Sequence, residues 1–246
     1  MRIDLNGDVG EGFDDSAFIP LLSSVNVACG AHAGDATTIE ATILLASAAS
    51  VAVGAHPGYP DREGFGRRDV DMRPDELETS ILDQVSLMAH VAARCGAELR
   101  HVKAHGALYN RAARDPGVAL PIARAVRRIS AGLALVGPPG SALLAAAVET
   151  GLRPVAEAFA DRAYEPDGSL RLRSLPGAVH VDRAVAARQA VAIARDGRVV
   201  AFDGSALEMR AETICLHGDT PGAVEHARAV RAALEEAGVS IGAVEP

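Results

Sequence analysis

Short apolar runs alternate with longer segments in which apolar residues recur every three or four positions, through the whole chain. The short runs have the length of buried β-strands, and we predict strands over Arg2–Leu5, Val25–Cys29, Val51–Ala55, Leu99–Ala104, Leu133–Val136, Arg153–Phe159 and Thr213–Leu216. Val199–Phe202 is predicted to be a short strand or an extended piece. The periodic segments predict helices over Thr37–Ser50, Arg73–Cys95, Gly117–Ile129, Ser141–Thr150, Arg183–Arg195 and Pro221–Ala237.

Strands that alternate with helices are typical of parallel strands joined by right-handed crossovers. About seven such units suit a closed barrel better than an open sheet, so we predict an α/β fold, a seven-stranded parallel (β/α) barrel that resembles a TIM barrel. Because no linker or composition break divides the chain, we assign residues 1–246 to one barrel domain. Two long irregular stretches, Gly58–Asp71 and Ala160–Val181, are candidate functional loops.

Polar residues stand at the end of nearly every predicted strand. Parallel barrels bring the C-terminal ends of their strands to one rim, where their active sites lie. Taken singly, a residue such as Asp8 or Asp219 could be only a helix N-cap. The recurrence from strand to strand predicts a functional site at the rim, built from Asp8, Glu11, Asn26, His32, Asp35, His56, Lys103, His105, Glu157, Asp161, His217 and Asp219. His90 and His226 lie inside predicted helices and are interpreted as surface or packing histidines.

Lys103 is the single lysine of the chain, while the other 23 of its 24 basic residues are arginines. A GC-rich genome would explain the arginines, but a lysine retained under that pressure can be one that arginine does not replace. Lysine has a compact ammonium and a tunable pKa, whereas arginine has neither. The position of Lys103 near a strand end predicts that it points into the barrel mouth.

The net charge is 24 − 32 = −8, which argues against nucleic-acid or anionic-membrane partners because both require a basic face. Three scattered cysteines without a C-x-x-C pair indicate no disulfide scaffold and favour a reducing, cytoplasmic location. The charged N-terminus does not resemble a secretory signal, and the apolar run Leu143–Val148 is far shorter than a membrane span of about 20 residues. We therefore expect a soluble protein.

Eight motifs in chain order resemble those of the LamB/YcsF family. They are Asp4–Glu11, Asn26–Gly30, His32–Asp35, Gly54–Asp61, Gly64–Arg68, Val102–Asn110, Phe159–Arg162 and Cys215–Asp219. The chain departs from the family pattern in three places: the segment after Phe13 is short and lacks the usual Trp, Ala31 replaces a common aromatic residue, and Ala104 replaces the usual Pro. The resemblance implies a barrel of the glycoside hydrolase/deacetylase type and ATP-coupled opening of 5-oxoproline to L-glutamate, with B and C partner subunits.

Such a reaction requires a cation for developing negative charge, acid–base groups and groups that grip a carboxylate or phosphate. With the resemblance, we assign Lys103 to the cation role, His32, His56 and His105 to acid–base roles and Asp8 to their orientation. No single histidine is assigned as acid or as base. Substrate binding is assigned to Asn26, Asp35, Glu11, Arg67, Arg68, Asn110, Asp161, Arg162, His217 and Asp219.

The sequence lacks the phosphate-loop pattern G-x-x-x-x-G-K-S/T, so we expect ATP, with Mg²⁺, mainly on the partner subunits or at a shared interface. Two alternatives stay open. In the first, Asp8, His32, His56 and His105 hold a divalent metal ion of a deacetylase or amidohydrolase on the same barrel. In the second, the chain only binds 5-oxoproline and presents it to catalytic partners.

Overall fold

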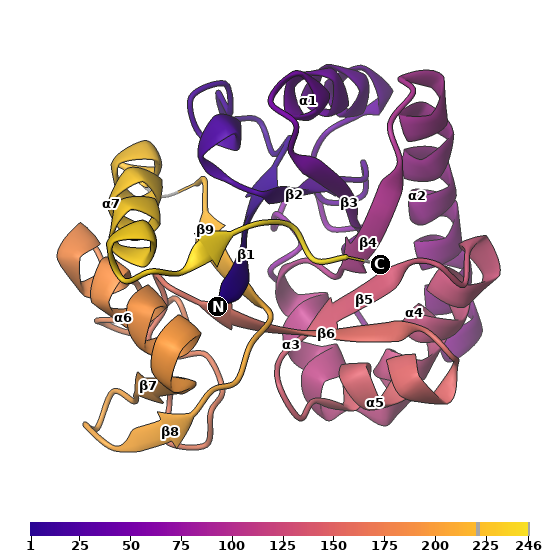
Figure 1. Ribbon diagram of the computed structural model, residues 1–246. Coiled ribbons are helices and arrows are strands. Elements are labelled where there is room, and N and C mark those ends of the chain that lie inside the picture. Colours follow the sequence, from indigo (N-terminus) through magenta and orange to yellow (C-terminus); the bar gives the residue numbers. More distant parts are fainter. Residues whose placement is uncertain (220–221, 246) are drawn as a thin grey trace.

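The computed structural model describes residues 1–219 and 222–245 and contains the closed seven-stranded parallel barrel that the strand–helix alternation predicts (Figure 1). β1 pairs in parallel with β2 on one side and with β9 on the other, which closes the ring. The barrel strands are β1 (Arg2–Val9), β2 (Ser24–Ala28), β3 (Ala52–His56), β4 (Leu99–Lys103), β5 (Ala134–Gly137), β6 (Arg153–Phe159) and β9 (Thr213–His217).

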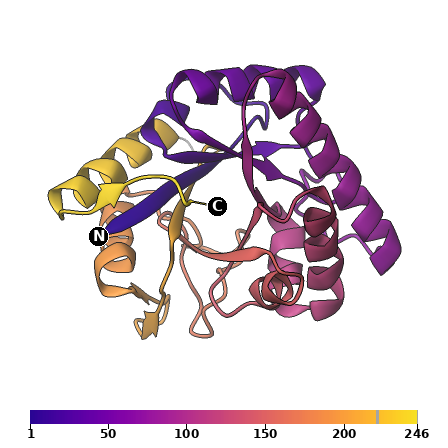
Figure 2. The ribbon, with the colours of Figure 1, turned by 45° about the vertical axis from the view of Figure 1, so that its right-hand side comes forward.

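Helices surround the outside of the barrel (Figures 1 and 2). They are the 3₁₀ turn η1 (Ile19–Leu21) and the α-helices α1 (Ala36–Ala48), α2 (Pro74–Arg94), α3 (Gly106–Arg114), α4 (Pro116–Ile129), α5 (Ala142–Glu149), α6 (Arg183–Asp196) and α7 (Ala223–Glu236). The six predicted helices are confirmed to within two residues at each described end, while Pro221, the predicted start of the last one, lies outside the described residues. Helix α3 was not predicted, because nine residues without a side-chain N-cap resemble a loop.

Polar side chains fill the inside of the barrel, and this corrects the predicted end of the first strand. Along β1 the buried Asp4, Asn6 and Asp8 alternate with the buried Ile3 and Leu5. Side chains of a strand point alternately to its two faces, so the apolar set packs under the helices and the polar set lines the interior. The prediction that the strand ends before Asn6 is therefore wrong. The residues Asn6, Gly7 and Asp8 have the composition of a turn, but the backbone of β1 continues to pair with β2 up to Val9.

The C-terminal segment covers the end of the barrel at which β1 begins (Figure 2). β10 (Ser240–Ile241) pairs with the start of β1, and Val244 packs against Ala134, Val136 and Val155. The site predicted at the opposite rim thus lies at the end that this segment leaves free. The predicted strand near Val199 is not part of the barrel, since β7 (Arg198–Val200) forms an antiparallel ribbon with β8 (Ala206–Glu208).

The structure also describes the cysteines and the length and polarity of the helices. All three cysteines are free thiols. Within residues 1–219 and 222–245, every helix is too short or too polar to cross a lipid bilayer.

Gly54→Ala is expected to lower the free energy of unfolding by about 2 kcal/mol, the scale of overpacking a closely packed interior. A methyl group at Gly54 on β3 would overlap the imidazole of His101 on β4, whose Nε2 lies 2.8 Å from Asn26 Oδ1. Urea unfolding measures the effect. Gly132→Ala is the control, because a methyl group there meets nothing closer than Ser130 Oγ at 3.5 Å; equal stability changes in both variants would contradict the expected close packing.

Candidate active site

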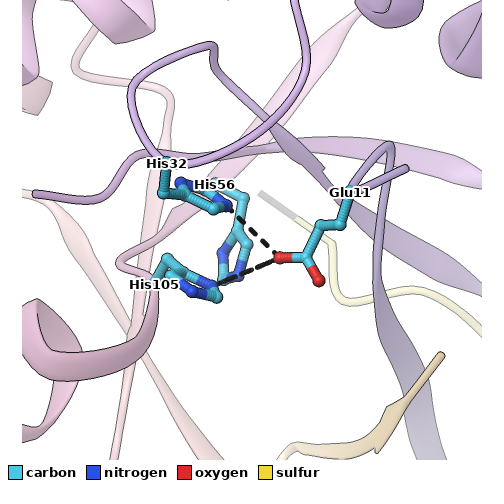
Figure 3. A group of neighbouring side chains, drawn as sticks. All are labelled: Glu11, His32, His56 and His105. Carbon is cyan, nitrogen blue, oxygen red and sulfur yellow. Dashed lines mark hydrogen bonds and ion pairs between the residues drawn. The ribbon is translucent and has the colours of Figure 1, made fainter. Parts of the chain in front are cut away.

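Four side chains from the ends of neighbouring strands converge at the C-terminal rim of the barrel (Figure 3). Glu11 follows β1, His32 follows β2, His56 ends β3 and His105 follows β4. Glu11 Oε1 lies 3.3 Å from His32 Nε2, 3.3 Å from His105 Nδ1 and 3.9 Å from His56 Nε2. The side chains of all four are at most 6% exposed, so this is a buried polar cluster, which we call the histidine cluster.

Backbone carbonyls orient two of the rings from behind. His56 Nδ1 lies 2.8 Å from the Lys103 carbonyl oxygen, and His105 Nε2 lies 2.8 Å from the Phe65 carbonyl oxygen. A carbonyl oxygen only accepts hydrogen bonds, so each of these nitrogens carries the hydrogen. The other nitrogens, His56 Nε2 and His105 Nδ1, point into the cluster and are 3.0 Å apart.

Burial and charge act differently on the members of the cluster. Burial lowers the pKa of His32 to about 4; its contact with Glu11 acts in the opposite direction, while the two neighbouring imidazoles also lower the pKa. Burial also acts against a charged His56, but the Asp8 carboxylate outweighs it and raises the pKa of His56. Burial would raise the pKa of Glu11, yet its contacts with His105 and His32 hold that pKa well below the usual range.

Lys103 lies beside the histidine cluster, inside the barrel, as its strand-end position predicts. Its ammonium is 2.9 Å from Glu157 Oε1, 3.0 Å from Asp8 Oδ1 and 3.1 Å from Cys215 Sγ, and the residue is 2% exposed. Burial acts against the charge, but Asp8 and its neighbours raise the pKa of Lys103 well above its usual value. Lys103 is therefore a fixed cation, and the expected advantage of a tunable pKa does not apply here.

Asp8 connects Lys103 to the histidine cluster. Its Oδ2 lies 3.2 Å from His56 Nε2, and its Oδ1 accepts a hydrogen bond of 2.8 Å from Asn26 Nδ2 as well as the one from Lys103. Burial would raise the pKa of Asp8, but His56 and Lys103 hold it well below its usual range. Asn26 also donates to Asn6 Oδ1, so it positions Asp8 from deep inside the barrel.

A third group lies on the other side of the rim. His217 Nδ1 is 3.0 Å from Asp161, and its ring stacks on Phe159 with centroids 5.6 Å apart. Burial would raise the pKa of Asp161, but His217 lowers it to about 2. Asp219 forms ion pairs with Arg67 and, at 3.7 Å, with Arg173. Both candidate loops therefore bring arginines to the same carboxylate.

The structure brings most of the predicted site residues together at this rim, but not all of them. Asp35 caps α1 by accepting a hydrogen bond from the Thr38 N–H. Arg68 pairs with Asp61 on the surface, and Asn110 is exposed on α3. Arg162 is buried and donates to the backbone carbonyls of Ala178 and Arg171. These four side chains are bound to other parts of the fold or face solvent.

The candidate metal set from the sequence placed Asp8 with the three histidines, and the structure corrects this to Glu11. A carboxylate oxygen of Glu11 and one ring nitrogen of each histidine all lie within 4.8 Å of one another, while Asp8 contacts His56 from the side of Lys103.

Several buried polar atoms at the rim have no hydrogen-bond partner among the described residues: His32 Nδ1, Tyr109 Oη, Glu157 Oε2 and Asp219 Oδ1. Buried atoms of this kind are available to a ligand. Tyr109 was not singled out, although it lies in the motif that contains Lys103 and His105.

Comparison with known proteins places the chain among relatives that share its full length. A protein from Chloroflexus aggregans, named as the A subunit of 5-oxoprolinase, is 51% identical over 98% of both chains, and one of the same name from Paracidovorax citrulli is 48% identical over 98% of both. The crystal structure of the lactam utilization protein from Thermus thermophilus has a TM-score of 0.94 and 45% identity, covering 99% of this chain and 100% of that one.

A more distant structure, the T48 deacetylase, has a TM-score of 0.51 at 15% identity, covers 98% of this chain and 86% of that one, and so shares the fold alone. The sequence model of the LamB/YcsF family matches residues 3–246. With the barrel and the full-length relatives, this match shows that the chain belongs to the LamB/YcsF family.

Proposed function

We propose that this chain is the A subunit of an ATP-dependent 5-oxoprolinase and opens the lactam ring of 5-oxoproline to L-glutamate together with B and C subunits. The full-length relatives named as A subunits of 5-oxoprolinase support the proposal at the level of the family. The observation that carries it for this chain is the buried Lys103 ammonium, held between the Asp8 and Glu157 carboxylates at the barrel mouth.

Opening a lactam requires that its amide resonance be broken. Phosphorylation of the lactam oxygen by ATP removes that resonance and leaves a good leaving group. Water then adds to the carbon, and the carbon–nitrogen bond breaks as the nitrogen takes up a proton, which leaves an acyl phosphate. A second water displaces inorganic phosphate from this acyl phosphate to give glutamate. Each step concentrates negative charge on oxygen or requires a proton at nitrogen, so the site must supply a fixed cation and acid–base groups.

The rim residues fit these requirements. Because its pKa is raised, Lys103 stays charged and stabilises developing negative charge rather than acting as a base. The histidine cluster and Asp8 supply acid–base or water-orienting groups beside it. Arg67 and Arg173, which pair with Asp219, are suited to the carboxylate of 5-oxoproline. ATP and its Mg²⁺ are assigned mainly to the partner subunits.

Glutamate and ADP are expected to form from 5-oxoproline only when this chain, the B and C subunits and ATP are all present. The physical reason is that the chain carries the lactam site but lacks a phosphate-binding loop. Coupled assays for both products, with each component omitted in turn, measure this requirement. If the isolated chain opened 5-oxoproline without nucleotide at the rate of the complex, the proposal would be wrong, and activity that needed only added metal would support an amidohydrolase instead.

A further inference from the structure

We propose that Glu11, His32, His56 and His105 form a binding site for one divalent transition-metal ion of the zinc class. The proposal concerns metal binding by the chain itself and does not depend on its activity toward 5-oxoproline. It rests on the hydrogen bonds behind the rings, on the distances between the inner atoms and on the kinds of donor atom that meet (Figure 3).

The orientation of the rings leaves lone pairs pointing at one another. The hydrogens of His56 and His105 face the carbonyl oxygens of Lys103 and Phe65, so in the neutral rings the inner nitrogens are unprotonated. These two nitrogens lie 3.0 Å apart, and each also faces a carboxylate oxygen: Asp8 at 3.2 Å from His56 and Glu11 at 3.3 Å from His105. Adjacent lone pairs repel unless a cation lies between them, so the cluster requires either a shared proton or a metal ion.

The distances between donor atoms suit a metal ion. Zinc–nitrogen and zinc–oxygen bonds of about 2.0–2.2 Å in a tetrahedron separate the ligand atoms by about 3.3–3.6 Å. Glu11 Oε1 lies 3.3, 3.3 and 3.9 Å from the three imidazoles, and His56 and His105 are 3.0 Å apart. The rings of His32 and His105 are stacked in parallel with their centroids 3.9 Å apart, so one of the two rings must turn before all four donors meet at one ion.

The chemistry of the donors selects the class of ion. Three imidazole nitrogens and one carboxylate oxygen favour zinc and similar first-row ions, whereas Mg²⁺ and Ca²⁺ prefer sites built of oxygen. The Mg²⁺ expected with ATP would therefore bind elsewhere. Carbonyl oxygens behind two of the rings are the usual orienting partners of metal-bound histidines.

The described residues offer Glu11 no lysine or arginine as a substitute for the ion. Its ion-pair partners within 4.0 Å among residues 1–219 and 222–245 are the three histidines. Lys103 is directed instead to Asp8, Glu157 and Cys215. The loop at residues 57–73 also packs closely on the rings, since a methyl group at Gly58 would lie 2.8 Å from His32 Nδ1. The loop thus limits the movement of the His32 ring.

Metal binding is tested on the isolated chain, free of affinity tags and stripped with a chelator, without nucleotide or substrate. Titration with Zn²⁺ by calorimetry is expected to give about one equivalent at sub-micromolar affinity, and Co²⁺ is expected to give the visible absorption of a tetrahedral site. Glu11→Gln and His105→Gln each remove a ligand and are expected to weaken Zn²⁺ binding about 100-fold or more, the upper end of the effect of removing even an outer partner.

His90→Gln is the matched control, because His90 is exposed on α2, outside the histidine cluster, and its loss should leave Zn²⁺ binding unchanged. Circular dichroism checks the fold of each variant, and the Zn²⁺-induced rise in melting temperature is a second measure of binding. If His105→Gln does not fold, the comparison of wild type with Glu11→Gln decides whether the cluster binds the ion. A stripped wild type that binds Zn²⁺ no better than Glu11→Gln would overturn the proposal and assign a shared proton to the cluster. That result would leave the proposed 5-oxoprolinase function untouched.

Discussion

Replacing Lys103 with arginine is expected to lower the rate of glutamate formation by the assembled enzyme about 100-fold or more, the effect of removing one charge-stabilising donor. The Lys103 ammonium is a compact charge that contacts Glu157, Asp8 and Cys215 within 3.1 Å. A planar guanidinium does not fit between these three partners in the same way. Since both side chains stay charged at neutral pH, size and shape are the decisive difference. Steady-state glutamate release measures it.

Stability must be measured beside the rate, because Lys103 is 2% exposed. The larger arginine is expected to cost about 1–3 kcal/mol through overpacking. Lys103→Met removes the positive charge but leaves the buried carboxylates of Asp8 and Glu157 without their cation. The double variant Lys103→Met/Glu157→Gln is therefore the better test of the missing charge, because it also neutralises one of these carboxylates. Rates are compared per folded molecule. An arginine variant with a near wild-type rate would show that the ammonium is not specifically needed and would favour a chain that only binds 5-oxoproline.

Asp8→Asn is expected to reduce the rate of the assembled enzyme by a similar factor, about 100-fold or more. The amide keeps the shape of the side chain but removes the charge that faces both Lys103 and His56. Without it, the electrostatic balance of both groups changes at once, since Asp8 is the main contact that raises the pKa of His56. The measurement is kcat and KM for 5-oxoproline in the assembled complex.

Asp4→Asn is the matched control for this variant. Asp4 lies on the same inner face of β1 and accepts hydrogen bonds from Ser23, Ser24 and Thr213. Burial raises the pKa of Asp4, whereas the pKa of Asp8 is lowered, so removing the charge is expected to cost less at Asp4 than at Asp8. We expect Asp4→Asn to keep most of the activity. Equal losses in the two variants would mean that Asp8 acts only through the stability of the barrel interior.

The order of strands and helices and the rim of polar residues were predictable from the sequence. Apolar periodicity is a local property, and parallel strands linked by helices necessarily bring their C-terminal ends to one side. Full-length motifs likewise indicated the family, which the comparisons then confirmed. These predictions did not require the register between neighbouring strands.

Only the tertiary structure decided which polar residues meet. Asp8 and Glu11 are three positions apart, yet the strand continues through Asp8 and ends before Glu11, so Asp8 turns to Lys103 and Glu11 to the histidines. Asp35 and Asn110 stand in motifs of the same family but face α1 and solvent. Register between neighbouring strands and the path of each loop select the contacts. Both are set by packing over long sequence distances, such as the separation of 95 positions between Asp8 and Lys103.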